Sequence, residues 1–110
     1  MEPIKGYTIL TNTISGYELI WRVIDENGDY PEIYETELEA QKAIVQEQMD
    51  ICQEFLSGDR KFDEMVWVNE EYIVAHISIQ PSGEMLVWLG EEGATDVIIE
   101  TSLSDWRNNL

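Results

Sequence analysis

The stretch TELEAQKAIVQEQMDICQEFLSG, residues 36–58, predicts one long helix around which the rest of the fold is arranged. Thr36 and Glu39 have the T-x-x-E spacing of a capping box, in which two side chains satisfy backbone N–H groups at the start of a helix. Ser57 and Gly58 supply the stop, because glycine readily adopts the left-handed conformation that ends many helices. We therefore predict a helix over residues 37–56.

The predicted helix has an apolar side and an acidic side. At about 100° per residue, most of its apolar side chains fall in one half of the helical wheel. They are Leu38, Ile44, Val45, Met49, Ile51, Cys52, Phe55 and Leu56. Carboxylates lie within a narrow arc of the other half and extend over roughly 22 Å. They are Glu39, Glu47, Asp50 and Glu54. We expect the apolar half to pack on a sheet and the carboxylates to form a stripe in solvent.

Two glutamines interrupt the apolar half of this wheel. Gln41 and Gln48 fall among the residues expected to face the core. A buried amide is costly unless it is hydrogen-bonded. We expect these side chains either to be hydrogen-bonded at the margin of the core or to mark a place where the helix does not meet it.

A β-hairpin is predicted ahead of the helix. Residues 17–24 alternate between faces in the manner of a strand. Asn27 and Gly28 supply the turn, since both residues tolerate a positive φ. Residues 30–35 form the returning strand.

The hairpin segment is also acidic enough to suggest a calcium loop, with seven carboxylates between residues 23 and 40. An EF-hand loop that started at Asp25 would need glycine at its sixth place and glutamate at its twelfth. The sequence has Tyr30 and Thr36 at those places. The hairpin is therefore the preferred interpretation.

Further strands flank the helix and set the fold class. Strand candidates are residues 7–11, 65–68, 72–80, 84–89 and 97–101. The C-terminal residues are either a short helix, capped by Ser102 or Ser104, or a loose tail. We predict a single acidic α+β domain over residues 1–110, with a mostly antiparallel sheet of about five to seven strands and one long amphipathic helix packed on one face. The predicted element order is β-β-β-α-β-β-β-β.

Several predicted strands are apolar on both faces, and one helix can cover only one face. Tyr72 and Val74, for example, alternate with Ile73 and Ala75. Large apolar patches are uncommon on the surface of monomers. We expect the second face to be covered by loops, by the C-terminal tail or by another chain, and a homodimer through this face is one hypothesis.

The composition is that of a folded but very acidic protein. Of its 110 residues, 44% are hydrophobic, which excludes the hydrophobe-poor composition of a disordered chain. Asp and Glu number 23 against six Lys and Arg, giving a net charge of -17 spread along the chain. No secretory signal or membrane-spanning stretch is recognisable, and Cys52 is the single cysteine. We expect a cytoplasmic protein.

The sequence contains no recognisable catalytic or metal-binding motif. His76 has no nucleophile assigned to it by any motif, so we interpret it as an ordinary strand histidine. Cys52 is interpreted as a small buried hydrophobe. Zinc spacings, phosphate-binding glycine loops and nucleophile elbows are missing. We therefore predict no enzymatic activity, no cofactor and no metal.

The charge favours binding to a basic protein over binding to nucleic acid. A tryptophan platform for bases would need surrounding Lys and Arg, and here the field has the opposite sign. The leading hypothesis is a non-enzymatic acidic nucleic-acid mimic that inhibits a basic, nucleic-acid-handling protein. It would be a phage or mobile-element counter-defence protein, of anti-CRISPR or anti-restriction type, or a nuclease immunity protein.

The expected partner-binding residues form two clusters. One is the helix stripe of Glu39, Glu47, Asp50 and Glu54, and the other is the hairpin tip with Asp25, Glu26 and Asp29. The alternative is a homo-oligomeric accessory or structural protein that recognises partners through an apolar sheet face, with acidity serving only solubility. The sequence leaves open the identity of the partner, the oligomeric state and which carboxylates meet in space.

Overall fold

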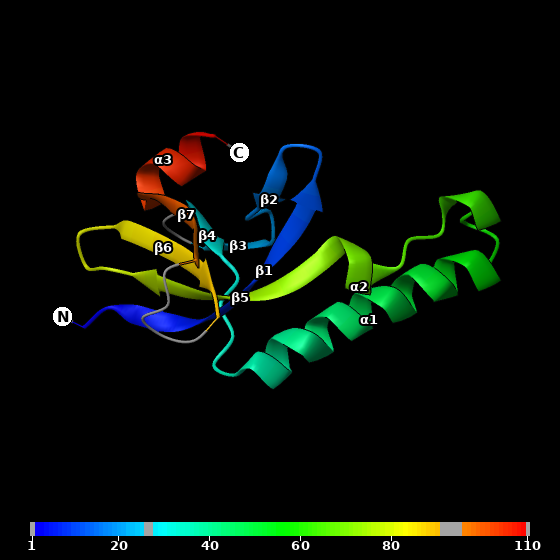
Figure 1. Ribbon diagram of the computed structural model, residues 1–110. Coiled ribbons are helices and arrows are strands. Elements are labelled where there is room, and N and C mark those ends of the chain that lie inside the picture. Colours follow the sequence, from blue (N-terminus) through cyan, green and yellow to red (C-terminus); the bar gives the residue numbers. More distant parts are fainter. Residues whose placement is uncertain (1, 26–27, 91–95, 110) are drawn as a thin grey trace.

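The computed structural model describes residues 2–25, 28–90 and 96–109 and has an α+β fold (Figure 1). The elements in chain order are β1 (Ile4–Thr13), β2 (Gly16–Glu18), β3 (Arg22–Asp25), β4 (Gly28–Pro31), α1 (Glu37–Leu56), the 3-10 helix η1 (Phe62–Glu64), α2 (Val68–Glu71), β5 (Tyr72–Ile79), β6 (Glu84–Leu89), β7 (Asp96–Ser102) and α3 (Leu103–Asn108). Five strands form one sheet in the order β2-β1-β5-β6-β7, and β3 and β4 form a second, two-stranded sheet. Neighbouring strands pair antiparallel, which confirms the predicted fold class.

The centre of the large sheet is the long pairing of β1 with β5. It runs from Ile4 opposite Ile79 to Thr11 opposite Tyr72. On the side of β1 away from β5, the backbones of Tyr7 and Tyr34 exchange two hydrogen bonds, at 2.8 and 2.7 Å. Gly6 permits this approach, because a Cβ atom there would lie 2.6 Å from the Tyr34 carbonyl oxygen.

The main core lies between the large sheet and a cover made of the β3–β4 hairpin and α3. Its buried side chains are Leu10, Leu19, Ala75, Ile77, Ile79, Met85, Val87 and Trp106. The indole Nε1 of Trp106 donates a 3.0 Å hydrogen bond to the Leu19 carbonyl, and the Arg107 guanidinium donates to the Asp29 carbonyl. One of the predicted alternatives is thus confirmed, because the chain's own loops and C-terminal segment cover this face.

The C-terminal segment is a short helix rather than a loose tail. Ser102 is its N-cap, and its hydroxyl accepts a 3.0 Å hydrogen bond from the Asp105 backbone N–H. Of the two predicted caps, Ser102 is the one used. This cap sets the helix direction that carries Trp106 into the core.

Helix α1 has the predicted bounds, with Thr36 as its N-cap. The Thr36 hydroxyl accepts from the Glu39 N–H at 3.1 Å, while the Glu39 carboxylate accepts from the N–H of Glu35 at 3.3 Å. At the other end, Gly58 has a φ of +90°, in agreement with the predicted stop. Helix α1 and α3 lie on opposite sides of the large sheet (Figure 1).

The packing of α1 differs from the prediction. The helix contacts β1 and β5, but within it only Ala40 and Ile51 are buried. Much of the predicted apolar half is therefore in solvent. The half-wheel grouping was too broad, because the buried residues occupy a much narrower arc.

Two predicted strands are also corrected. Residues 17–24 are not one strand: β2 pairs with β1, whereas β3 pairs with β4, and buried Leu19 lies between them. Residues 65–68 are not a strand either, because helix α2 starts at Val68. The hairpin itself is confirmed by the pairing of Asp25 with Gly28, but its returning strand is Gly28–Pro31 rather than residues 30–35. Asn27 lies outside the described residues.

Candidate functional site

The molecule divides into a β body and an α1 arm. The β body is both sheets with α3, and the α1 arm is residues 37–71, from the start of α1 to the end of α2. The longest dimension of the molecule is 48 Å, against 31 and 26 Å for the others. Figure 1 shows that α1 produces this elongation, because its C-terminal half extends beyond the sheet together with η1. The arm therefore offers a surface that the body does not shield.

A glutamine connects the outgoing and returning chains of the arm. The Gln48 amide nitrogen donates to the Val66 carbonyl at 3.1 Å, and its oxygen accepts from the Val68 N–H at 3.0 Å. The first alternative predicted for Gln48 is thus confirmed. The same amide nitrogen lies 3.6 Å from Cys52 Sγ, and Cys52 is half-buried rather than part of the main core.

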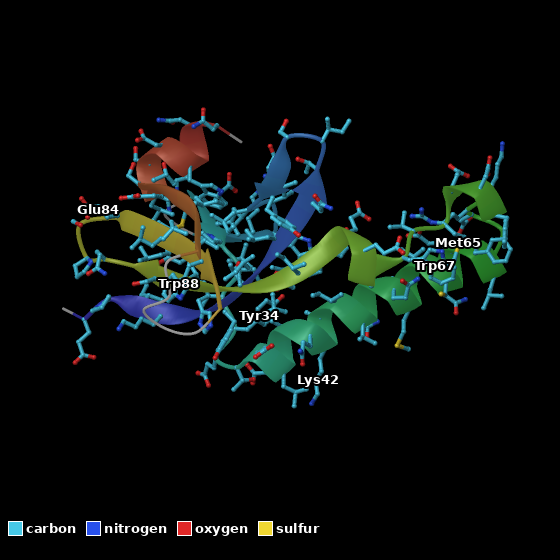
Figure 2. All side chains as sticks on the ribbon, in the orientation of Figure 1. Tyr34, Lys42, Met65, Trp67, Glu84 and Trp88 are labelled. Carbon is cyan, nitrogen blue, oxygen red and sulfur yellow. The ribbon has the colours of Figure 1, made fainter. Side chains whose placement is uncertain are left out.

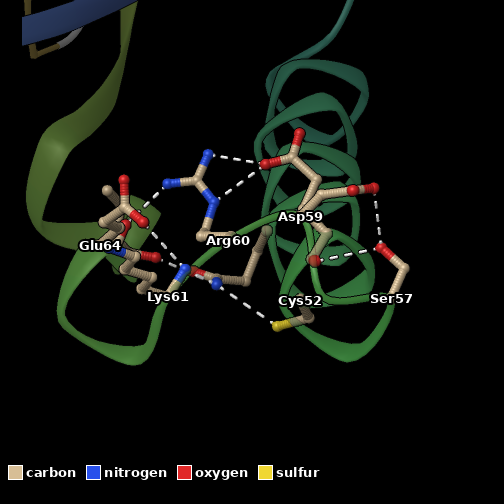
Figure 3. A network of polar contacts seen from close by, with 9 residues as sticks. Cys52, Ser57, Asp59, Arg60, Lys61 and Glu64 are labelled. Carbon is tan, nitrogen blue, oxygen red and sulfur yellow. Dashed lines mark hydrogen bonds and ion pairs between the residues drawn. The ribbon is translucent and has the colours of Figure 1, made fainter.

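The tip of the arm is held by the polar contacts drawn in Figure 3 and by one aromatic pair. Arg60 is paired with Glu54 at 2.7 Å and also donates to the Glu64 carbonyl at 2.7 Å. The rings of Phe55 and Phe62 meet edge to face with centroids 5.9 Å apart. Figure 2 places Trp67, 59% exposed, in the same outer part of the arm.

The four predicted helix carboxylates all lie on α1 but differ in their surroundings. Glu39, Asp50 and Glu54 are exposed, whereas Glu47 is half-buried. The Glu39 carboxylate accepts from the Glu35 N–H just before the N-cap, and Asp50 accepts a 3.0 Å hydrogen bond from the Gln46 amide. Glu54 has the Arg60 guanidinium as its partner. Three of the four carboxylates are therefore exposed along α1, and Arg60 compensates the charge of Glu54 at the tip.

Glu47 faces the sheet. Glu47 lies close enough to Tyr72 to affect its ionisation. The pKa of the Tyr72 hydroxyl is raised mainly by burial, and to a smaller extent by the negative charges of the Glu71 and Glu47 carboxylates. Tyr72 begins β5, so Glu47 lies on the side of α1 next to the sheet. A partner that contacts the acidic stripe would meet Glu47 at its margin.

The second predicted cluster is only partly described by the structure. Glu26 lies outside the described residues, as does the side chain of Asp25. Asp29 is half-buried and lies 3.6 Å from the Arg22 guanidinium. Asp29 thus belongs to a local ion pair on the hairpin.

An exposed apolar stripe on α1 was not identified from the sequence. Its residues are Leu38, Val45, Met49 and Leu56. Between 57% and 76% of each side chain is exposed. The sequence contained a signal for this stripe. With Leu38 set at 0° on the helical wheel, the four residues fall within an arc of about 40°, whereas Ala40 and Ile51 lie on nearly the opposite side, at about 200–220°. We call this surface the apolar stripe.

His76 lies within an aromatic ladder on the β body. Its ring is stacked on Trp88 at 5.3 Å and tilted against Tyr7 at 4.8 Å, through residues paired across β1, β5 and β6. The ladder lines an open hollow of about 710 Å³ that Glu35 and Glu37 also border. Ring packing accounts for this histidine, in line with its interpretation as an ordinary strand residue.

The described residues bring no three or more His, Cys, Asp or Glu side chains together in a way that could hold a metal ion. Within that same part of the chain, the helices are too short or too polar to cross a bilayer. Comparisons with protein-family models, curated proteins and solved structures give no significant match.

Proposed function

We propose that the protein is a non-enzymatic acidic binding protein that occupies a basic, nucleic-acid-handling surface of another protein and inhibits it. One observation carries the proposal: α1 projects from the β body and displays Glu39, Asp50 and Glu54 along its exposed length. The net charge of -17 adds a field of the same sign around this helix.

The physical basis is that a row of carboxylates can take the place of a phosphate backbone. Duplex DNA has about one charge per 1.7 Å of its axis, and a 20-residue helix is about 30 Å long. The α1 stripe is therefore a sparser version of that charge array. Opposite charge raises the association rate with Lys- and Arg-lined channels and fixes the orientation of the bound partner. A phage or mobile-element counter-defence protein, or a nuclease immunity protein, would use such a surface.

The experiment compares two variants with the same loss of charge. The helix variant is E39Q/E47Q/D50N/E54Q, in which the new amides keep hydrogen-bond acceptors at the cap and at Arg60. The body variant is E2Q/E18Q/E84Q/E100Q, which removes exposed carboxylates elsewhere. A partner is first captured from host lysate at low salt, identified by mass spectrometry and purified. Its affinity for each variant is then measured against salt and against competing duplex DNA.

We expect the helix variant to bind the partner about tenfold or more weakly, and the body variant to bind almost as well as the native chain. Duplex DNA should compete with the native protein, and binding should weaken steeply as salt rises. Equal losses of affinity in both variants would mean that the overall negative charge, and not the position of the helix carboxylates, determines binding. Association that persists at high salt would favour the alternative, in which apolar recognition defines an accessory or structural protein.

A further inference from the structure

The apolar stripe is unusual because it faces solvent along the whole length of α1. Leu38 and Leu56 mark its ends and lie 18 residues apart, which is about 27 Å along the helix axis. Val45 and Met49 lie between them at 57% and 60% exposure. Contiguous exposed apolar surface on a soluble domain commonly marks an interaction site. The spacing of i, i+7, i+11 and i+18 is that of a helix that inserts its apolar face into a groove.

Carboxylates lie on both sides of the apolar stripe at its N-terminal end and on one side farther along the helix. With Leu38 set at 0°, Glu37 lies at about -100°, and Glu39 and Asp50 lie at about +100° and +120°. All three side chains are exposed. Lys42, at about +40°, points away from the helix into solvent (Figure 2). A surface that covers the stripe would therefore meet acidic side chains at both margins near the start of α1 and at one margin farther along.

This charge pattern decides between a second copy and a different partner. Two copies paired through the stripe would bring together two chains that each have a net charge of -17. Repulsion between like charges across an interface disfavours such pairing. A partner with an apolar floor and Lys or Arg at its rims satisfies both the stripe and its margins.

We propose that α1 is a ligand helix that docks into a partner's groove, with the apolar stripe on the groove's floor and Glu37, Glu39 and Asp50 against its basic rims. This inference rests on the proposed function and specifies the chemistry of the partner surface. Charge brings the two proteins together, and burial of the stripe slows their dissociation. The target surface is then an amphipathic groove rather than an evenly basic channel.

The test uses two synthetic helical peptides of about 18 residues, matching the length of the stripe. One has Leu along one face and Lys along the other, and the second has Gln in place of every Leu, so that their charges are equal. Their affinities are measured by titration against the native chain and two variants. The stripe variant is V45Q/M49Q. The matched control is I14Q/I24Q, which removes two apolar side chains of the β body that are also largely exposed.

We expect the native chain and the I14Q/I24Q control to bind the Leu/Lys peptide about tenfold or more tightly than the Gln/Lys peptide. The V45Q/M49Q variant should lose this preference while it still binds both peptides through charge. The inference is overturned by equal affinity of the native chain for both peptides, by retention of the preference in V45Q/M49Q, or by its loss in the control. It is also overturned if sedimentation shows a native dimer that V45Q/M49Q dissociates, since the occupant would then be a second copy.

The charge variant E39Q/E47Q/D50N/E54Q separates this inference from the proposed function. If the helix carboxylates attract basic partners, this variant should bind both peptides more weakly with the ratio of affinities preserved. Unchanged binding of both peptides would contradict the acidic stripe and the placement of Glu39 and Asp50 against basic rims, whereas loss of the preference in V45Q/M49Q alone would still identify the apolar stripe as the docking face. Far-UV circular dichroism of each variant verifies that α1 is still formed.

Discussion

The β body and the α1 arm bury their apolar side chains to very different degrees. In the body, Leu10, Ile77, Met85 and Val87 are fully buried. In the 20-residue helix of the arm, only Ala40 and Ile51 are buried. The free energy of folding therefore comes mainly from the body, because burial of apolar surface is the dominant favourable term. The arm depends on caps and a few hydrogen bonds, which leaves its surface available for binding.

Truncating one tryptophan in each region is the strongest test of this comparison. Trp106 is 7% exposed and hydrogen-bonded to Leu19, whereas Trp67 is 59% exposed. We expect Trp106→Ala to lower the free energy of unfolding by about 3–5 kcal/mol, since it leaves a cavity in the core. Trp67→Ala should change it by less than about 1 kcal/mol. Urea denaturation measures both, and equal losses would mean that the arm contributes to the same core.

Loss of the Gln48 amide should affect the arm alone. In Gln48→Leu the Val68 N–H and the Val66 carbonyl lose their partner, at a cost of about 1–3 kcal/mol. Amide hydrogen exchange should accelerate at Val68 and leave the β5 amides of the body unchanged. Gln46→Leu, at an exposed position on the same helix, is the control and should have little effect. Faster exchange throughout β5 would show that arm and body unfold together.

The N-cap of α1 gives a smaller effect. Thr36→Ala removes the hydroxyl that accepts from the Glu39 N–H, and we expect a loss of about 1 kcal/mol. Thr36→Ser keeps an acceptor at the same place and should retain most of the stability. The two variants are compared by thermal unfolding followed at the helical circular dichroism band. A larger loss than in Gln48→Leu would mean that the arm is held mainly at its base.

The smallest expected effect at neutral pH lies where the arm leaves the body. The Tyr34 hydroxyl is buried and has no hydrogen-bond partner within the described part of the chain. Burial and the nearby Glu32 carboxylate raise the pKa of this hydroxyl above its ordinary value. Tyr34→Phe should therefore change stability by less than about 1 kcal/mol at pH 7, because the hydroxyl makes no hydrogen bond of good geometry there.

The sign of the pH dependence follows from the raised pKa of Tyr34. An unfolded tyrosine ionises near pH 10, whereas the folded one keeps its proton to higher pH. Above about pH 10 the unfolded chain loses the Tyr34 proton while the folded chain retains it, so the free energy of unfolding decreases as the pH rises. Below about pH 10 this residue makes no pH-dependent contribution. Native protein should thus lose stability faster than Tyr34→Phe in denaturant titrations above pH 10. Parallel curves for the two proteins would contradict the raised pKa.

Local signals predicted much of the fold, and contacts distant in sequence explain the errors. The bounds of α1 were predicted because Thr36 and Gly58 act within one turn of the helix ends. Residues 17–24 were misread because Leu19 is fixed by Trp106, far along the chain, which no local alternation reveals. The apolar run at 65–68 resembled a strand, but Gln48 binds its backbone and α2 begins there.

The candidate site was predicted only in part. The helical period placed four carboxylates on one side of the predicted helix. In the structure all four lie on α1, three of them exposed and Glu47 half-buried. The same period contained a signal for the apolar stripe, but it did not reveal which side of α1 would meet the sheet, because that depends on contacts with β1 and β5. The stripe is exposed because it lies on nearly the opposite side of the helix from buried Ala40 and Ile51.

The hydrogen bond between Trp106 and Leu19 also has a consequence during synthesis. Its two partners are 87 residues apart, and the ribosome makes the Leu19 end first. Until Trp106 has emerged from the exit tunnel, the growing chain lacks the part of the cover that α3 provides for the sheet face containing Ile77 and Met85. The β body should therefore complete its folding late, and ribosome-bound chains stalled before residue 106 should bind chaperones that recognise exposed apolar strands.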